Sequence, residues 1–306
     1  MRFFCCLIFL SCIFVKNSFA NNNNNYILCT SHCSDVRLSF VQPLTFPEEC
    51  QNNNTVTNIQ AYALACIIEY RINYDFEDIN IKFQASNDTN IFEDRKPSEY
   101  LTQEIRLDLK KHRTQSNEVT RIYRCNSKND CARDFYLNTI YDLVNDGQKQ
   151  LNKIKGKLYT TKAVIGESSK RHCIDNNLTG TKTSELCGYG LCFVRQKNYT
   201  LNQERTEKQQ KCYLEENSPS LFSSIEYHAP KPNENDNELL EYKCNKHVCN
   251  RNEMILIIQE LINQYTRWNP IEETIPVEEK KASSSMKQTI SSYIVVLFLI
   301  LIQLFF

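Results

Sequence analysis

The sequence predicts an α+β protein with two tandem disulfide-rich β modules, each followed by an amphipathic helix. Two observations predict this fold class. Twelve of the fifteen cysteines lie between two apolar ends of the chain, and they divide into two groups of six. Within each group, residues that alternate between apolar and polar, as in half-buried strands, precede a segment with the apolar period of a helix.

Residues 1–20 have the features of a secretory signal peptide. Arg2 precedes an apolar block at 3–15, and Ser18-Phe19-Ala20 places small residues at the −3 and −1 positions of a cleavage site. We therefore expect this segment to be removed as the chain enters the secretory pathway.

The first module is expected at residues 26–158. Apolar and polar residues alternate over 68–74, 79–83 and 105–109, which predicts three strands. After Cys131 the period changes, and the apolar residues form one helical stripe: Tyr136, Ile140, Leu143, Val144, Leu151 and Ile154. We expect this stripe to pack on the sheet; the alternative is that it packs against another helix or a partner.

A linker is expected at 159–172 and the second module at 173–270. The sequence around Asn252 predicts a helix N-cap, and Asn269-Pro270 ends the same helix. The apolar stripe of this helix consists of Met254, Ile255, Ile258, Leu261, Ile262 and Tyr265. From Cys131 and Cys249 onward the two modules align without a gap, which indicates an internal duplication.

A basic run overlaps the end of the first module and the linker. It contains a single acid, Glu167. Such a run could bind an acidic surface or lipid headgroups, but we interpret it as the solvated face of a linker. Its members are Lys149, Lys153, Lys155, Lys157, Lys162, Lys170 and Arg171.

The even number of cysteines in a secreted chain predicts a disulfide framework, with bonds confined to each group. Zinc binding is the alternative use, but paired CxxC motifs at ligand spacing do not occur. Spacing points to only two individual bonds, Cys244–Cys249 and Cys125–Cys131. The twelve cysteines are Cys29, Cys33, Cys50, Cys66, Cys125, Cys131, Cys173, Cys187, Cys192, Cys212, Cys244 and Cys249.

Four N-glycosylation sequons lie in the same part of the chain, which is consistent with exposed loops in a secreted protein. The acceptor residues are Asn53, Asn87, Asn177 and Asn198. Because the chain is rich in Asn, one or two of these sequons could occur by chance and stay unmodified.

The C-terminal end resembles a glycosylphosphatidylinositol (GPI) attachment signal. A stalk at 271–284 leads to small residues, then to a polar spacer, and then to an apolar tail at 294–306 without a basic stop. We expect residues 285–306 to be exchanged for a lipid on the outer leaflet of the plasma membrane. The alternative is a single-pass helix from about Ile290. The candidate attachment residues are Ser283, Ser284 and Ser285.

The second module ends Cys244-Asn-Lys-His-Val-Cys249-Asn250, a Cys-x4-Cys-Asn terminator. This motif resembles the end of three-finger domains, the family of snake toxins and the urokinase receptor, over Cys173–Asn250, about a quarter of the chain. The resemblance implies three-finger β-sheets, a binding role, and an Asn side chain bonded to nearby backbone. Lys243 replaces a usual cysteine, and the first module ends in Cys-x5-Cys-Ala instead.

The charge balance and the motifs argue against some classes of function. Processing of both ends removes three of the 36 basic residues and no acid, which gives a net charge of −3 and argues against a nucleic-acid partner. The sequence contains no nucleophile motif or phosphate-binding loop, and it predicts no catalytic, cofactor or metal residues.

We therefore expect a cell-surface glycoprotein, not an enzyme, that binds an unknown extracellular protein or ligand and is attached to the membrane by a lipid or a helix. A hydrolase of the secretory pathway and a structural coat protein are the alternatives.

Overall fold

The computed structural model describes residues 26–31, 33–51, 60–90, 92, 96–110, 117–161, 171–176, 183–199, 206–214, 218–233 and 236–270. The chain divides into two compact units, Met1–Ile271 and Glu272–Phe306, and the described residues all belong to the first. The expected signal peptide, stalk and attachment residues lie outside the described residues, as do Asn53 and Asn177. Of the helices that are described, none is long and apolar enough to cross a membrane.

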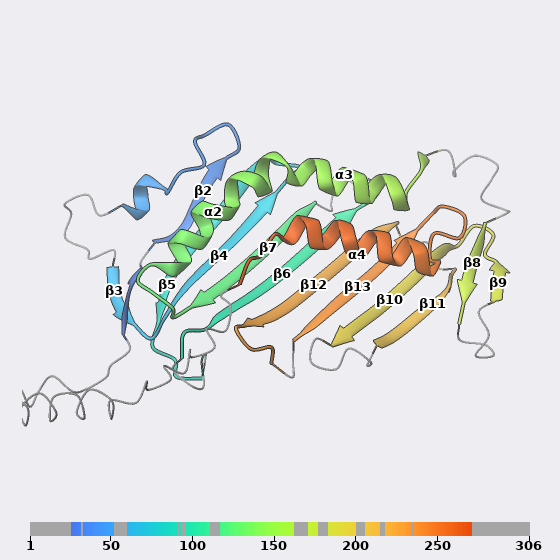
Figure 1. Cartoon of the computed structure of the whole chain (residues 1–306). Coiled ribbons are helices and arrows are strands. Elements are labelled where there is room, and N and C mark those ends of the chain that lie inside the picture. Colours follow the sequence, from blue (N-terminus) through green and yellow to red (C-terminus); the bar gives the residue numbers. More distant parts are fainter. Residues whose placement is uncertain are drawn as a thin grey trace, which may run out of the picture. The chain divides into compact units, whose positions relative to one another are not determined.

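The described chain is built on one nine-stranded antiparallel sheet with the order β11-β10-β13-β12-β6-β7-β4-β5-β2 (Figure 1). Two small ribbons, β1–β3 and β8–β9, accompany it. The strands of the sheet are β2 (Cys33–Ser39), β4 (Ala65–Asn73), β5 (Asp78–Ser86), β6 (Glu99–Asp108), β7 (Glu118–Cys125), β10 (Leu191–Tyr199), β11 (Thr206–Tyr213), β12 (Ser220–Ala229) and β13 (Asn237–Cys244). The ribbons consist of β1 (Ile27–Thr30), β3 (Gln60–Ala63), β8 (His172–Asp175) and β9 (Thr183–Leu186).

The prediction of two tandem modules, each closed by its own helix, is wrong. Strands β6 and β12 pair antiparallel along ten residues, from Asp108 opposite Ser220 to Glu99 opposite Ala229, and this pairing makes the two halves one sheet. The physical reason is that a separate module would expose β6 or β12 as a long edge with unpaired backbone groups. The fold is predominantly β, with helices on one face of the shared sheet.

The two halves nevertheless share a strand order. In the first half the strands run β5-β4-β7-β6 across the sheet, and in the second half they run β11-β10-β13-β12. In both cases the order is second, first, fourth, third along the chain. The internal duplication itself stays a prediction.

The helices cover one face of the sheet (Figure 1). The stripe predicted for the first helix is buried, although it is divided between two helices that meet at Asp146. In the second stripe Ile255, Ile258, Ile262 and Tyr265 are buried, while Met254 and Leu261 are partly buried. The bounds are η1 (Glu48–Cys50), α2 (Cys131–Asn145), α3 (Gly147–Leu158) and α4 (Asn252–Thr266).

The predicted N-cap of the last helix is displaced by one residue. Helix α4 begins at Asn252, and the N-cap is Arg251, which makes no side-chain capping bond. The Asn252 side chain instead accepts a hydrogen bond from Lys208 Nζ (2.7 Å). The Asn252 side-chain oxygen, which the sequence predicts to cap α4, is therefore bonded to Lys208 on β11 instead.

A fully buried arginine connects the first half to the last helix. Arg121 on β7 has no exposed surface, and its Nη2 donates to the carbonyl oxygens of Thr266 (2.6 Å) and Tyr265 (3.2 Å). Its Nε donates to Gln103 Oε1 (2.6 Å). The carbonyl groups at a helix C-terminus carry partial negative charge, so the guanidinium is stabilised there without a carboxylate.

Two buried tyrosines continue this contact toward α2. Tyr74 Oη donates to the carbonyl of Leu143 (2.6 Å) and is hydrogen-bonded to Tyr265 Oη (2.6 Å). Burial raises the pKa of both hydroxyl groups, so they stay protonated at physiological pH. Gly147 lies against this pair, because a Cβ atom there would be 2.1 Å from Tyr74 Oη.

The prediction of a disulfide framework is confirmed. The twelve cysteines form six bonds, and each bond stays within its own half of the chain. The two bonds to which the spacing pointed, Cys125–Cys131 and Cys244–Cys249, are both present. The other four bonds are Cys29–Cys66, Cys33–Cys50, Cys173–Cys192 and Cys187–Cys212.

The contact at Gly147 generates the first testable prediction. Gly147→Ala should lower the free energy of unfolding by about 2 kcal/mol, because the added methyl group collides with Tyr74 and Tyr265. Gly156→Ala is the matched control in the same helix, since an added Cβ there has no neighbour within 4 Å. It should stabilise the protein by about 0.5–1 kcal/mol. Urea unfolding of both variants measures these changes, and equal effects would contradict the close packing at Gly147.

Candidate functional site

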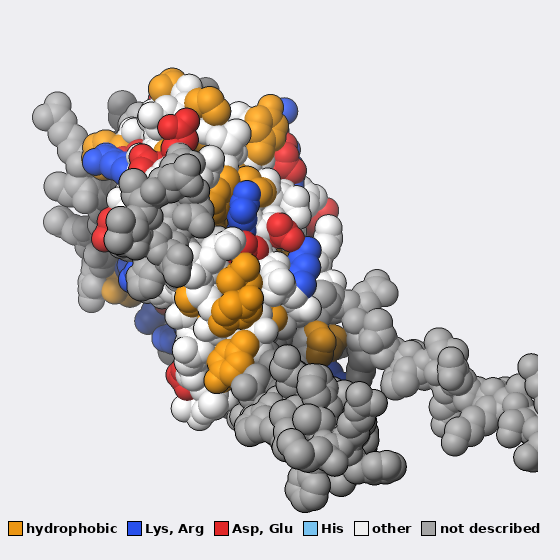
Figure 2. All heavy atoms as spheres, turned by 90° about the vertical axis from the view of Figure 1, so that its left-hand side faces the viewer, with side chains coloured by type: hydrophobic (Ala, Val, Ile, Leu, Met, Phe, Trp, Pro, Cys, Tyr) orange, Lys and Arg blue, Asp and Glu red, His pale blue; other side chains and the backbone are white. Residues whose placement is uncertain are grey.

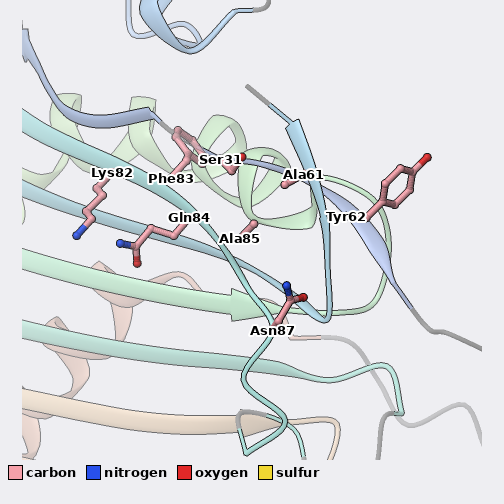
Figure 3. Close-up of a pocket in the computed structure, with 8 residues that line it drawn as sticks. All are labelled: Ser31, Ala61, Tyr62, Lys82, Phe83, Gln84, Ala85 and Asn87. Atoms are coloured by element: carbon pink, nitrogen blue, oxygen red, sulfur yellow. The ribbon is translucent and has the colours of Figure 1, made fainter. Parts of the chain in front are cut away.

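The candidate site is a pocket between β3 and the end of β5, which we call the β3–β5 slot. Its volume is about 430 Å³, within the range of small-ligand sites. Figure 3 shows Lys82, Gln84 and Asn87 along β5 and its end, with the Tyr62 ring on the far side of β3. The lining residues are Ser31, Ala61, Tyr62, Lys82, Phe83, Gln84, Ala85 and Asn87.

The slot exists because β2 pairs with only part of β5. The last residue pair between these strands is Cys33 opposite Phe83, after a register shift next to Asp35. Beyond it, the residues at 84–86 pair with β4 alone. Asp35 has a positive φ of 61° and lies at this register shift, between the pairs Cys33–Phe83 and Val36–Ile81. The vacated edge of β5 becomes one side of the slot.

The other side is the β1–β3 ribbon, which Asp130 holds in place. The Asp130 carboxylate accepts hydrogen bonds from the backbone N of Thr30 (2.5 Å) and from Gln60 Nε2 (3.1 Å). The Cys29–Cys66 disulfide ties the same ribbon to β4. At the closed end, the backbone N of Leu64 donates to Asn87 Oδ1 (3.3 Å). Three separate parts of the chain are thus fixed around one opening.

The lining combines apolar and polar side chains. Lys82 is the cation among the eight lining residues, and Gln84 and Asn87 add amide groups. Phe83 is buried and extends to the opposite side of β5 from Lys82 and Gln84, while Tyr62 is 72% exposed. Such a set fits a ligand or peptide segment that offers hydrogen-bonding groups and a flat or apolar face, and it favours an anionic group near Lys82.

The two described sequons lie in different surroundings. Asn87 is exposed in the turn that follows β5, and Asp88 N and Asn90 N are bonded to Ser86 and Asp88 side chains there. Asn198 lies within β10, pairs with both neighbouring strands, and accepts a hydrogen bond from Gln196. Asn87 also lines the slot, so a glycan on it would start at the slot's edge.

A histidine–aspartate pair is the arrangement closest to catalytic chemistry. The buried Asp236 accepts hydrogen bonds from both the backbone N and the Nδ1 of His228. The His228 ring lies 4.3 Å from the ring of Tyr100, whose hydroxyl donates to Glu226 (2.5 Å). Among the residues that the structure describes, no hydroxyl or thiol is hydrogen-bonded to His228 Nε2. The pair therefore lacks the nucleophile that a triad requires.

The sheet face away from the helices is a solvated surface. Its side chains form neighbouring ion pairs, such as Arg71 with Glu118 (3.2 Å) and Arg106 with Glu104 (2.7 Å). Arg106 also lies over the Phe222 ring. Figure 2 shows the side at the left of Figure 1, where hydrophobic groups are separated by polar and charged ones.

The Asn250 side chain of the terminator motif is hydrogen-bonded to the backbone of β8. Asn250 is fully buried; its Nδ2 donates to the carbonyl of Ile174 (2.8 Å) and its Oδ1 accepts from the same residue's N (2.9 Å). These bonds hold β8 against the Cys244–Cys249 loop. The resemblance to three-finger domains stays a prediction, because the bonds of a single residue do not establish a family.

Sequence reasoning did not find the slot. Its residues come from four separate stretches, and the sequon at Asn87 was the one lining residue that the sequence singled out. The Gly188–Gly190 segment is a turn with Tyr189 exposed. Across the described ranges, no three His, Cys, Asp or Glu side chains converge to hold a metal ion.

Comparisons with protein-family models, with curated proteins and with solved structures gave no match to this chain.

The contrast between the two sequons gives the second prediction. Asn87→Gln should remove one N-glycan from the protein made in animal cells, because Asn87 lies in an exposed turn. Asn198→Gln should leave the glycan number unchanged, since Asn198 lies inside a paired strand. Gel mobility before and after enzymatic deglycosylation, together with glycopeptide mass spectrometry, measures the occupancy. A glycan on Asn198 and none on Asn87 would reverse this assignment.

Proposed function

We propose that this chain is a GPI-anchored glycoprotein of the cell surface that binds an extracellular ligand or protein at the β3–β5 slot. The six disulfides support an extracellular location, because disulfides persist in an oxidising compartment. The small residues, polar spacer and apolar run at 282–306 and the signal-like residues 1–20 support the lipid anchor.

The fixed walls of the slot support a ligand-binding function. Cross-linking by Cys29–Cys66 and the bonds of Asp130 fix the slot walls before any ligand arrives. Pre-formed walls reduce the conformational entropy that the protein loses when a ligand binds, which is how a small contact area gains affinity. The Lys82 ammonium is the group of this lining best suited to contribute binding energy.

An enzyme remains the second class of function, and the His228–Asp236 pair is the feature on which it would depend. A carboxylate that orients the Nδ1 of a histidine is common to catalytic and structural sites. Because the described surroundings offer no nucleophile at Nε2, binding is the function that the geometry supports better.

The third prediction concerns the anchor. Treatment of cells that express the protein with a phosphatidylinositol-specific phospholipase should release it into the medium, because a GPI-linked protein has no polypeptide span to retain it. Flow cytometry of the remaining surface protein measures the loss. A known GPI-anchored protein and a single-pass protein on the same cells serve as controls. Retention of this protein while the GPI-anchored control is released would favour a transmembrane helix.

The fourth prediction concerns the slot. The full-length protein should be screened against arrays of extracellular proteins and glycans, and each ligand found should be retested with Lys82→Glu. That variant should weaken binding by about tenfold or more, because it reverses the charge of the slot. Lys128→Glu is the control, since Lys128 is exposed and pairs with Asp134 away from the slot lining.

The GPI anchor and the slot as the binding site are tested independently of each other. If phospholipase releases the protein but no ligand binds more weakly to Lys82→Glu, the GPI anchor is supported. The slot is then not the binding site. Ligand binding that both lysine variants retain would place the binding site elsewhere on the surface.

A further inference from the structure

The basic run at 149–171 is not only a linker. Its first part forms α3, whose inner face buries Leu151, Ile154 and Leu158. Residues 162–170 of the run, with Lys162 and Lys170, lie outside the described residues, and Arg171 is buried. The interpretation of the whole run as a solvated linker face is therefore wrong for α3, which is a packed helix with a basic outer face.

Three lysines form a stripe along that outer face. Lys149, Lys153 and Lys157 are all exposed and follow one another at intervals of four residues. At a rise of about 1.5 Å per residue, they lie on one side of the helix and span roughly 12 Å. Helix α3 contains no acidic residue that could pair with them. We call these three residues the lysine stripe.

The acids nearest in the chain are already engaged. Asp142 and Asp146, at the end of α2, both pair with Arg267, at 3.0 and 3.1 Å. Beyond the stripe, Lys246 donates a hydrogen bond to the carbonyl of Gly156 and brings a further cation to the C-terminal end of α3. The positive charge of this face is therefore left largely uncompensated, on a protein whose full sequence has a net charge of zero.

Helix stability explains only part of the stripe. Cations near a helix C-terminus interact favourably with the helix dipole, which accounts for Lys155 and Lys157 in the last turn. The same dipole disfavours Lys149 in the first turn. The chain thus keeps an unfavourable cation at the N-terminal end of α3, where it extends the stripe to its full length.

We propose that the lysine stripe binds a sulfated polysaccharide of the extracellular matrix or cell surface. The disulfides place the protein outside the cytosol, where sulfated polysaccharides are abundant linear polyanions. A straight row of ammonium groups about 6 Å apart matches a linear chain of regularly spaced sulfates and carboxylates better than a compact anion. Binding releases counterions from the polyanion, so its affinity must fall as salt rises.

An anionic membrane is the competing occupant, and two observations disfavour it. The strongly anionic leaflet of the plasma membrane faces the cytosol, on the other side from a disulfide-bonded protein. A helix that lies on a membrane also presents large apolar residues to the lipid. The exposed residues of α3 are Lys149, Asn152, Lys153, Gly156 and Lys157, none of which could insert.

The test uses cells that lack their own glycosaminoglycans and display the full-length protein. Fluorescent heparin is titrated onto them at several sodium chloride concentrations, and an antibody measures the amount of protein at the surface. The stripe variant carries Lys149→Gln, Lys153→Gln and Lys157→Gln. The control variant carries Lys96→Gln, Lys128→Gln and Lys231→Gln, three exposed lysines outside α3 with the same total charge change.

Heparin should bind the unmodified protein with an affinity that falls steeply with salt. Each lysine close to a polyanion changes affinity by roughly fivefold, so the stripe variant should bind about a hundredfold more weakly. The control variant should bind within about threefold of the unmodified protein. Its salt dependence should also stay the same, whereas that of the stripe variant should become shallower.

Three outcomes would overturn the proposal. One is equal heparin binding by the stripe and control variants. Another is undiminished binding of fully desulfated heparin, because the stripe would then not recognise sulfates. The third is stripe-dependent binding of phosphatidylserine vesicles but not of heparin, which would make a membrane the occupant. Both variants alter exposed lysines only, so equal surface amounts by antibody show that loss of binding is not loss of folding.

Discussion

The pairing of β6 with β12 is the interaction on which the remaining architecture depends. Ten residue pairs at the centre of the sheet convert two groups of strands into one surface wide enough for α2, α3 and α4 to lie on together. Because the helices share that surface, the C-terminus of α4 reaches the guanidinium of Arg121, and Tyr265 reaches Tyr74. Without the central pair, a buried cation and a buried hydroxyl pair would each lose their partners.

Local pattern predicted the elements but not how they combine. Alternation over 68–74 and the stripe around Ile140 identified a strand and a helix, because each depends on neighbours a few residues apart. The partner of β6 is more than a hundred residues away, and alternation shows which face of a strand is buried without showing which strand lies beside it. The cysteine spacing succeeded for Cys125–Cys131 and Cys244–Cys249, since short loops leave few other partners.

The slot could not be predicted for a related reason. It depends on the point where β2 stops pairing with β5, at Cys33 opposite Phe83, and on Asp130, which holds a ribbon a hundred residues earlier in the chain. The residues that line it have ordinary surface composition. The sequence shows the lysine stripe only as part of a basic run. The structure shows that the three lysines lie on one face of a packed helix.

The buried arginine has a consequence for how the chain is made. Arg121 is translated 145 residues before Thr266, whose carbonyl accepts its hydrogen bond. At roughly 5–20 residues per second, this interval lasts about 7–30 s. During it, the guanidinium of Arg121 lacks its carbonyl partners and stays hydrated, and the β6 edge is open, which favours pairing with other chains. The first half therefore completes its sheet and its buried hydrogen bonds only after the last helix has been translated.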